Sequence, residues 1–197
     1  MNYLAHAYLS FGEPDILIGN MISDFIKGKK QFDYLLPIQK GIQLHRAIDE
    51  FTDFHSVTKE AKQLLKPAAG AYAGAFIDVV YDHFLALDAE VYTKAHWEFF
   101  SADVYRQLSF RETELPEKFR RILPYMISQN WLVNYRELTG IENSFRGLCH
   151  RAKYLTDSKP IFELFITHYA KLQQHYFQFF PDVKKFAQQR LSELLNA

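Results

Sequence analysis

Apolar residues recur along most of the chain at helical spacing, every three or four positions, and few stretches alternate with a period of two. We therefore expect an all-α fold. Pro37, Pro116 and Pro160 suit helix starts, because proline fixes φ and its missing N–H is not needed there. Pro181 should break or kink the last helix near Phe180. The predicted helices cover residues 2–10, 14–27, 37–54, 57–66, 71–87, 90–108, 116–129, 138–153 and 160–195.

The length of 197 residues, with 48% hydrophobic and 16% aromatic residues, allows one well-buried core. We find no internal repeat, low-complexity tract or linker, and residues 28–34 and 65–72 have the composition of loops. The expectation is a single domain over residues 1–197, built as a helical bundle.

Charge and cysteine content narrow the possible partners. The chain has 23 Lys+Arg and 23 Asp+Glu, so no overall field attracts nucleic acid or an anionic membrane. No apolar run approaches the roughly 18 residues of a membrane span. The single cysteine, Cys149, excludes an intramolecular disulfide and a multi-cysteine zinc site, and the start MNYLAHAYLSFGEPD does not resemble a secretory signal. We expect a cytoplasmic protein with no nucleic-acid or membrane partner. The pattern does not predict an oligomeric state.

In the segment GIQLHRAIDEFTDFH, three ionisable residues follow one another at intervals of four: His45, Asp49 and Asp53. This spacing puts them on one side of a helix. On a helical wheel with about 100° per residue, His45 and Asp49 fall inside the arc of the apolar side chains. Asp53 falls at the edge of this arc, where an ion pair with Arg46 or Lys59 explains it equally well. His45 and Asp49 therefore point into the protein.

Three other apolar helices carry the same anomaly, in the segments NYLAHAYL (Asn2, His6), DILIGNMISDFI (Asn20, Asp24) and GAFIDVVYDHFLAL (Asp78, Asp82, His83). An unpaired buried carboxylate costs several kcal/mol, so it protonates, pairs or binds a cation. The obvious cation, Arg46, lies on the polar side of its helix. One or two divalent metal ions would neutralise the carboxylates, and mixed His and Asp ligands favour Mn²⁺, Fe²⁺ or Zn²⁺ over Ca²⁺.

Simpler explanations exist for single residues. An interior histidine such as His6 is more often a hydrogen-bonded core residue than a ligand. Asn20 can satisfy a contact between helices, and Asp78 can orient a ligand imidazole without touching the metal. The joint occurrence of so many ionisable residues on apolar helices nevertheless favours one shared polar site.

The chain resembles the acyl carrier protein phosphodiesterase family in four blocks: MNYLAHAYLS, GNMISDFIKG, GIQLHRAIDEFTD and DVVYDHFL. A weaker similarity is present in LTGIENSFRGLCHRA. This family is a divergent branch of the HD-type metal phosphohydrolases. The resemblance implies an HD-domain-like all-α fold and a divalent metal, usually Mn²⁺ or Mg²⁺. It also implies hydrolysis of the phosphodiester that joins 4′-phosphopantetheine to a serine of holo-acyl carrier protein. One departure from most HD enzymes is that Asp82 precedes His83 here.

On this basis we expect a metal, Mn²⁺ first with Mg²⁺ or Fe²⁺ as alternatives, held by Asp24, His45, Asp82 and His83. His6 and Asp49 come next as ligands or as catalytic groups, since Asp49 can orient His45 or relay a proton. Arg46 leaves the apolar face and is expected to reach a phosphate oxygen at the rim of the site.

The resemblance further implies an acidic carrier protein as substrate, which would need a local basic surface on this neutral chain. The candidate surfaces are Lys27, Lys29 and Lys30, or Arg120 and Arg121, or Arg146, Arg151 and Lys153. Solvated surface charge is the simpler explanation of each. Two other functions stay open at this stage: an HD-like phosphohydrolase of a nucleotide or another small phosphodiester, and a helical metal-binding module without enzymatic activity.

Overall fold

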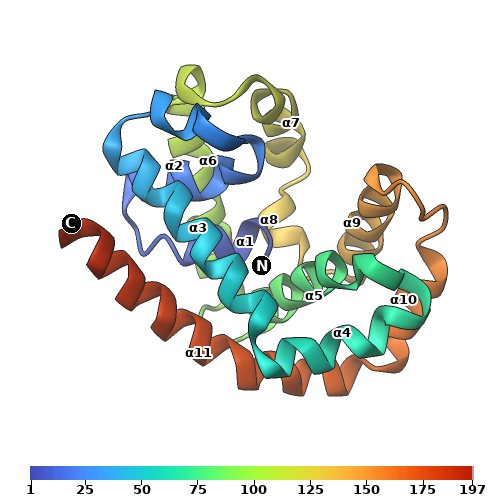
Figure 1. Cartoon of the computed structure of the whole chain (residues 1–197). Coiled ribbons are helices and arrows are strands. Elements are labelled where there is room, and N and C mark those ends of the chain that lie inside the picture. The colour runs from blue at the N-terminus through green and yellow to red at the C-terminus, as the bar shows by residue number, and fades with distance from the viewer. Residues whose placement is uncertain (197) are drawn as a thin grey trace.

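Helices joined by short turns make up the part of the chain that the computed structural model describes, residues 1–196, and no strand occurs in it (Figure 1). The all-α prediction is confirmed. The α-helices are α1 (Tyr3–Tyr8), α2 (Pro14–Ile22), α3 (Leu36–Phe54), α4 (Ser56–Ala69), α5 (Ala73–Leu87), α6 (Lys94–Phe110), α7 (Glu117–Ser128), α8 (Trp131–Asn134), α9 (Leu138–Arg151), α10 (Lys159–Thr167) and α11 (Tyr169–Asn196). Four short 3₁₀ helices lie between them: η1 (Ser23–Phe25), η2 (Gly28–Asp33), η3 (Gly70–Tyr72) and η4 (Glu112–Glu114).

Several boundaries differ from the predicted ones for local reasons. α6 begins four residues later than predicted, because the side chain of Thr93 accepts a hydrogen bond from the backbone N–H of His96 and caps the helix there. The predicted loop over residues 28–34 is wound into η2, and α8 was not predicted because four residues are too few for a periodic pattern.

The last predicted helix, residues 160–195, is divided at His168 and not at Pro181. α11 continues through Pro181, so a break near Phe180, one of the two predicted outcomes, is wrong, and the alternative of a kink stays a prediction. A proline inside a helix costs about 3 kcal/mol or more. The buried side chains around it, among them Phe179, Phe180 and Val183, each contribute roughly 1.5–3 kcal/mol and offset that cost.

Figure 1 shows α11 running along the outer edge of the molecule, past α3 and α4, while the N-terminus and α1 lie near the centre. Buried apolar side chains from α1 through α11 form one continuous cluster. Among the described residues, no helix combines the length and apolar character that crossing a bilayer requires. The central position of α1 brings its residues against both α2 and α5.

Two glycines allow α2 and α3 to cross at very short range. A Cβ atom at Gly19 would lie 2.1 Å from the carbonyl oxygen of Ile38, and one at Gly41 would lie 2.4 Å from that of Ile16. Both distances are shorter than any real Cβ contact, so only glycine fits at either position without moving the backbone. The crossing sets the position of the next residue, Asn20, relative to the following turn of α3.

We expect Gly41→Ala to lower the free energy of unfolding by about 1–3 kcal/mol or more, because the added methyl group forces the two backbones apart. The matched control is Gly147→Ala, also within a helix, where an added Cβ meets no atom within 4 Å. There the better helix propensity of alanine should raise stability by roughly 0.5–1 kcal/mol. Urea unfolding measures both, and equal stability of the two variants would contradict the close crossing.

Candidate metal centre

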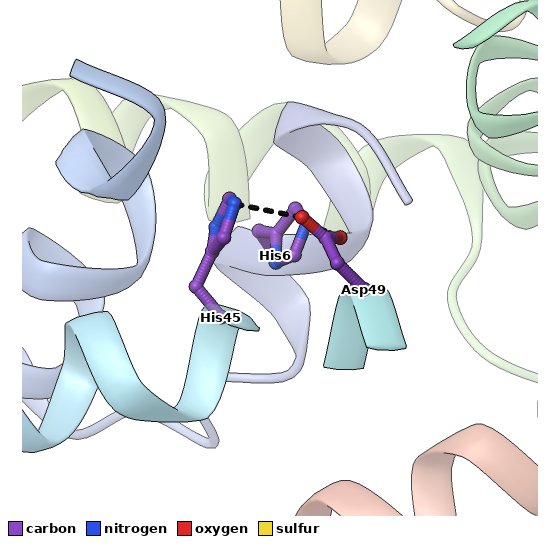
Figure 2. Close-up of side chains that lie close together, drawn as sticks. All are labelled: His6, His45 and Asp49. Atoms are coloured by element: carbon purple, nitrogen blue, oxygen red, sulfur yellow. Dashed lines mark hydrogen bonds and ion pairs between the residues drawn. The ribbon is translucent and has the colours of Figure 1, made fainter. Parts of the chain in front are cut away.

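The centre of the site consists of three side chains that lie close together: His6, His45 and Asp49 (Figure 2). His6 lies on α1, and His45 and Asp49 lie one turn apart on α3. One nitrogen from each imidazole and a carboxylate oxygen all lie within 4.8 Å of one another, and no other group of three potential ligands in the described residues meets this limit. The imidazole rings are stacked, with centroids 3.8 Å apart and planes 16° from parallel. The inward direction predicted for His45 and Asp49 is confirmed.

Asn20 fixes the orientation of both imidazoles. Its amide nitrogen donates to the backbone carbonyl of His6 (2.8 Å) and to the hydroxyl of Ser10 (3.1 Å). Its side-chain oxygen therefore accepts from Nδ1–H of His6 (2.8 Å), while its backbone oxygen accepts from Nδ1–H of His45 (2.7 Å). Since each Nδ1–H donates a hydrogen bond to Asn20, each ring in its neutral form directs an Nε2 lone pair toward the carboxylates, which is the arrangement that metal-binding histidines adopt.

The carboxylates face these two nitrogens. Asp49 places one oxygen 3.1 Å from Nε2 of His6 and the other 3.1 Å from Nε2 of His45. Asp24, in η1, lies 3.3 Å from the same nitrogen of His45. The imidazoles are buried, but the side chains of Asp49 and Asp24 are 39% and 69% exposed. The site is thus closed on the imidazole side and open to solvent on the carboxylate side.

The protonation states of His6, His45 and Asp49 follow from their burial and from the charges beside them. Burial, together with the adjacent His45 ring, lowers the pKa of His6 to about 4, so His6 is neutral at pH 7. Burial also disfavours a charge on His45, but hydrogen bonds to Asp24 and Asp49 outweigh it and raise its pKa to about 9. Without a metal, His45 is therefore protonated at pH 7, and its Nε2–H faces the carboxylates of Asp24 and Asp49. Burial raises the pKa of Asp49, but His6 and the amino group of Met1 outweigh it and hold this pKa far below the usual range.

A third acidic residue, Asp78 on α5, lies at the edge of the site. Its carboxylate is 2.9 Å from the amino group of Met1, which is also 3.5 Å from Asp49. The buried ammonium group lies between the two carboxylates, where it partly neutralises them. Asp78 thus belongs to the surroundings of the site, in keeping with the supporting role considered for it from the sequence.

The donor set suits a divalent metal ion. Two Nε2 lone pairs and the carboxylate of Asp49 converge, Asp24 adds a further oxygen beside His45, and the tautomer of each histidine is already fixed. Mixed imidazole and carboxylate ligands fit Mn²⁺, Fe²⁺ or Zn²⁺. The residues that would hold such an ion are His6, His45 and Asp49, with Asp24 at the rim.

Asp82 and His83, two of the predicted metal ligands, are not part of this cluster, so the structure does not bring them together with His45. Asp82 is fully buried, and its carboxylate accepts hydrogen bonds from the backbone N–H groups of Asn2, Leu4 and Ala5. These N–H groups belong to the start of α1, where helical N–H groups lack intrahelical partners. Asp82 therefore anchors the helix that carries His6.

His83 faces away from the cluster because consecutive helical residues point about 100° apart. Its Nδ1–H donates to the carbonyl of Tyr135 (2.6 Å), and its Nε2 lies 2.8 Å from the hydroxyl of Tyr169. Burial lowers the pKa of His83, which fits a neutral ring that donates at one nitrogen and accepts at the other. Its role is to connect α5 with the segments around α8 and α11.

Arg46 also lies elsewhere than expected. Its guanidinium donates to the side chain of Gln31 (2.8 Å) and to the carbonyl of Ile26 (3.2 Å), so it holds η2 against α3 and does not face the cluster. Asp53 is exposed and pairs with Lys62 at 2.7 Å, a partner other than the two considered from the sequence. The stripe on α3 therefore consists of two residues of the site and one surface residue.

Asn20 does more than satisfy a contact between helices, the role considered for it from the sequence. The signal was its place in a helix that is apolar on nearly all sides, where an amide needs several polar partners. Those partners are residues of the site itself.

We expect the stability of metal-free protein to depend on the charge of His45. Its folded-state pKa of about 9 lies above the usual 6.5, so its contribution is fully present below pH 6.5 and is lost as the pH rises toward 9. His45→Asn should remove this dependence. Chemical unfolding of the chelator-treated wild type and variant between pH 6 and 9.5 measures the difference, and parallel curves would contradict the assigned charge.

Comparisons with known proteins agree with the family resemblance of the sequence blocks. The family model described as acyl carrier protein phosphodiesterase matches residues 1–183. An acyl carrier protein phosphodiesterase of Klebsiella pneumoniae subsp. pneumoniae is 31% identical over 199 residues, covering 96% of this chain and 99% of that protein. One of Photorhabdus laumondii is 29% identical over 193 residues, covering 96% of each. No solved structure matches the chain. The chain belongs to the acyl carrier protein phosphodiesterase family.

Proposed function

We propose that this protein removes 4′-phosphopantetheine from holo-acyl carrier protein in the cytoplasm, using a divalent metal ion, with Mn²⁺ as the first candidate and Mg²⁺ or Fe²⁺ as alternatives. The products are apo-acyl carrier protein and 4′-phosphopantetheine. The observation that carries the proposal is the convergence of two tautomer-fixed imidazoles on Asp49. The names of the relatives, which are acyl carrier protein phosphodiesterases, supply the substrate.

The reaction forms a bond from a water oxygen to phosphorus and breaks the bond from phosphorus to the serine oxygen. A bound divalent ion lowers the pKa of water and polarises a phosphoryl oxygen. The Asp24 carboxylate is 69% exposed at the rim of the site, where it can take the proton that the attacking water loses. That proton balances the reaction when it is returned to the serine oxygen.

Asp49 contributes by orientation. Its two oxygens contact two different imidazoles, so its rotation is restrained from both sides. The same residue fixes the distance between His6 and His45 from the carboxylate side, while Asn20 fixes it from the other side. The donor atoms are therefore positioned before any ligand binds, which lowers the cost of reaching the reactive geometry.

We expect Asp49→Asn to lower the rate of phosphopantetheine release by about 100-fold or more, since even the partners of metal ligands typically cost 10–100-fold when altered. The matched control is Asp53→Asn, one turn further along α3, whose carboxylate is exposed and pairs only with Lys62. Its rate should stay within about twofold of wild type, because surface ion pairs contribute little. Mass spectrometry of holo-carrier protein incubated with the enzyme and Mn²⁺ measures the release.

A chelator should abolish the loss of mass, and added Mn²⁺ should restore it. Intact holo-carrier protein with each of several metals would overturn the proposal. Cleavage of small phosphodiesters without cleavage of holo-carrier protein would instead favour a small-molecule phosphohydrolase. A metal-dependent rise in thermal stability with no hydrolysis of either substrate would favour a binding module.

The segment around η2 is the candidate docking surface for the carrier protein. Lys27, Lys29 and Lys30 are all exposed, and η2 follows directly after the segment of Asp24. Phe32 and Leu35 beside them are 63% and 68% exposed. A surface that combines cations with exposed apolar side chains fits an acidic partner that also buries apolar area. The contacts of Arg46 hold this segment in place.

We expect the triple variant Lys27→Glu, Lys29→Glu and Lys30→Glu to raise KM for the carrier protein and to weaken its dependence on ionic strength, with kcat little changed. The control reverses three exposed lysines on α4 and α11, Lys66, Lys171 and Lys185, which gives the same net charge. Steady-state kinetics at low and high salt compare the two. Equal KM values in both variants would exclude η2 as the docking surface.

A further inference from the structure

A cavity of about 330 Å³ lies beside the candidate metal centre, between α1, α5, α7, α8 and α9. This volume falls within the range of about 300–1,000 Å³ that is typical of small-ligand sites. None of the residues assigned above to metal binding lines it. The cavity therefore needs an explanation of its own.

Its lining combines apolar walls with amide and hydroxyl groups. Tyr3, Trp131 and Tyr135 supply aromatic surface, while Asn134, Asn143 and Ser144 supply hydrogen-bonding groups. This composition suits a slender ligand with both apolar and amide portions, since polar groups in such pockets fix orientation and apolar walls supply contact area.

One side of α9 forms the length of the cavity. Gly140, Gly147 and Arg151 all line it. The 11 steps from residue 140 to residue 151, at a helical rise of about 1.5 Å each, give a length of about 16 Å. A site of this length fits an extended chain better than a compact ring system such as a nucleobase. Arg151 places a cation at one end.

The cavity connects to the metal centre through α1. Tyr3 lines the cavity three residues before His6, and burial and the negative charge of Asp24 raise its pKa to about 12, with Arg151 opposing this rise. Tyr3 and Arg151 both line the cavity, and Tyr3 belongs to the same short helix as His6 of the metal centre. Val79, also in the lining, adjoins Asp78 on α5.

We propose that this cavity binds the pantetheine arm of the substrate, with the phosphate directed to the end near Tyr3 and Arg151 and the two amides of the arm lying along α9. The inference rests on the proposed function and extends it by assigning a separate binding site for the part of the substrate that stays attached to the phosphate. None of the metal-binding residues and no residue of η2 lines this cavity.

Gly147 offers a way to block the cavity without disturbing the fold. It is exposed within α9, lines the cavity, and has open space around the position of a Cβ atom. Leucine is a better helix former than glycine, so Gly147→Leu should not lower stability. The matched control is Glu142→Leu, an exposed residue of α9 that does not line the cavity.

The test is direct binding of pantetheine and of 4′-phosphopantetheine to the metal-loaded protein, by calorimetry and tryptophan fluorescence. The chain has two tryptophans, and Trp97 is only 1% exposed, so a change on binding reports Trp131 in the cavity wall. We expect Gly147→Leu to raise the Kd of both ligands at least about tenfold, and Glu142→Leu to leave it unchanged. Thermal unfolding of both variants checks that the fold is kept.

Equal affinity of wild type and Gly147→Leu would overturn the proposal, as would saturation without a change at Trp131 or no binding to wild type. Tighter binding of adenosine monophosphate that Gly147→Leu abolishes would assign the cavity to a nucleotide instead. If wild type and Gly147→Leu release phosphopantetheine from holo-carrier protein with the same KM, the cavity assignment fails and the function stands. If neither cleaves but Gly147→Leu blocks pantetheine binding, the function fails and the cavity assignment stands.

Discussion

The hydrogen bonds of Asn20 are the interaction on which the site depends. One residue binds Nδ1 of His6 through its side chain and Nδ1 of His45 through its backbone, so the two imidazoles share a single support. This works only because α2 and α3 approach at Gly19 and Gly41 without side chains between them. The chemistry of the site thus rests on a contact between two backbones, which no exchange of ionisable side chains can replace.

The spacing along α3 predicted the inward direction of His45 and Asp49, since a helical period places each residue on a known side of its helix. The same reasoning could not separate Asp82 and His83 from the site. A buried ionisable residue signals only that polar partners exist, and for Asp82 those partners are backbone N–H groups of α1, which have no sequence signature. Helix ends were predicted less well wherever a tertiary contact decided them, as with the continuation of α11 through Pro181.

The site and the cavity share one support. α5 presents Asp82 to α1 and, one residue later, His83 to Tyr135, which lines the cavity. α1 in turn carries Tyr3 into the cavity wall and His6 into the cluster. Asp82 and His83, which have the appearance of metal ligands in the sequence, therefore connect the metal centre to the cavity.

The shortness of α1 has a thermodynamic consequence. A helix of six residues is far below the length at which helices persist alone, so it exists here through tertiary contacts, namely its buried apolar side chains and its hydrogen bonds with Asp82 and Asn20. Local opening of this segment would withdraw His6 from the cluster without unfolding the remaining helices. A ligand that binds His6 shifts that opening equilibrium by mass action, and the ordering of α1 in turn raises the affinity for the ligand. The ordering of α1 and the binding of a ligand at His6 are therefore linked equilibria.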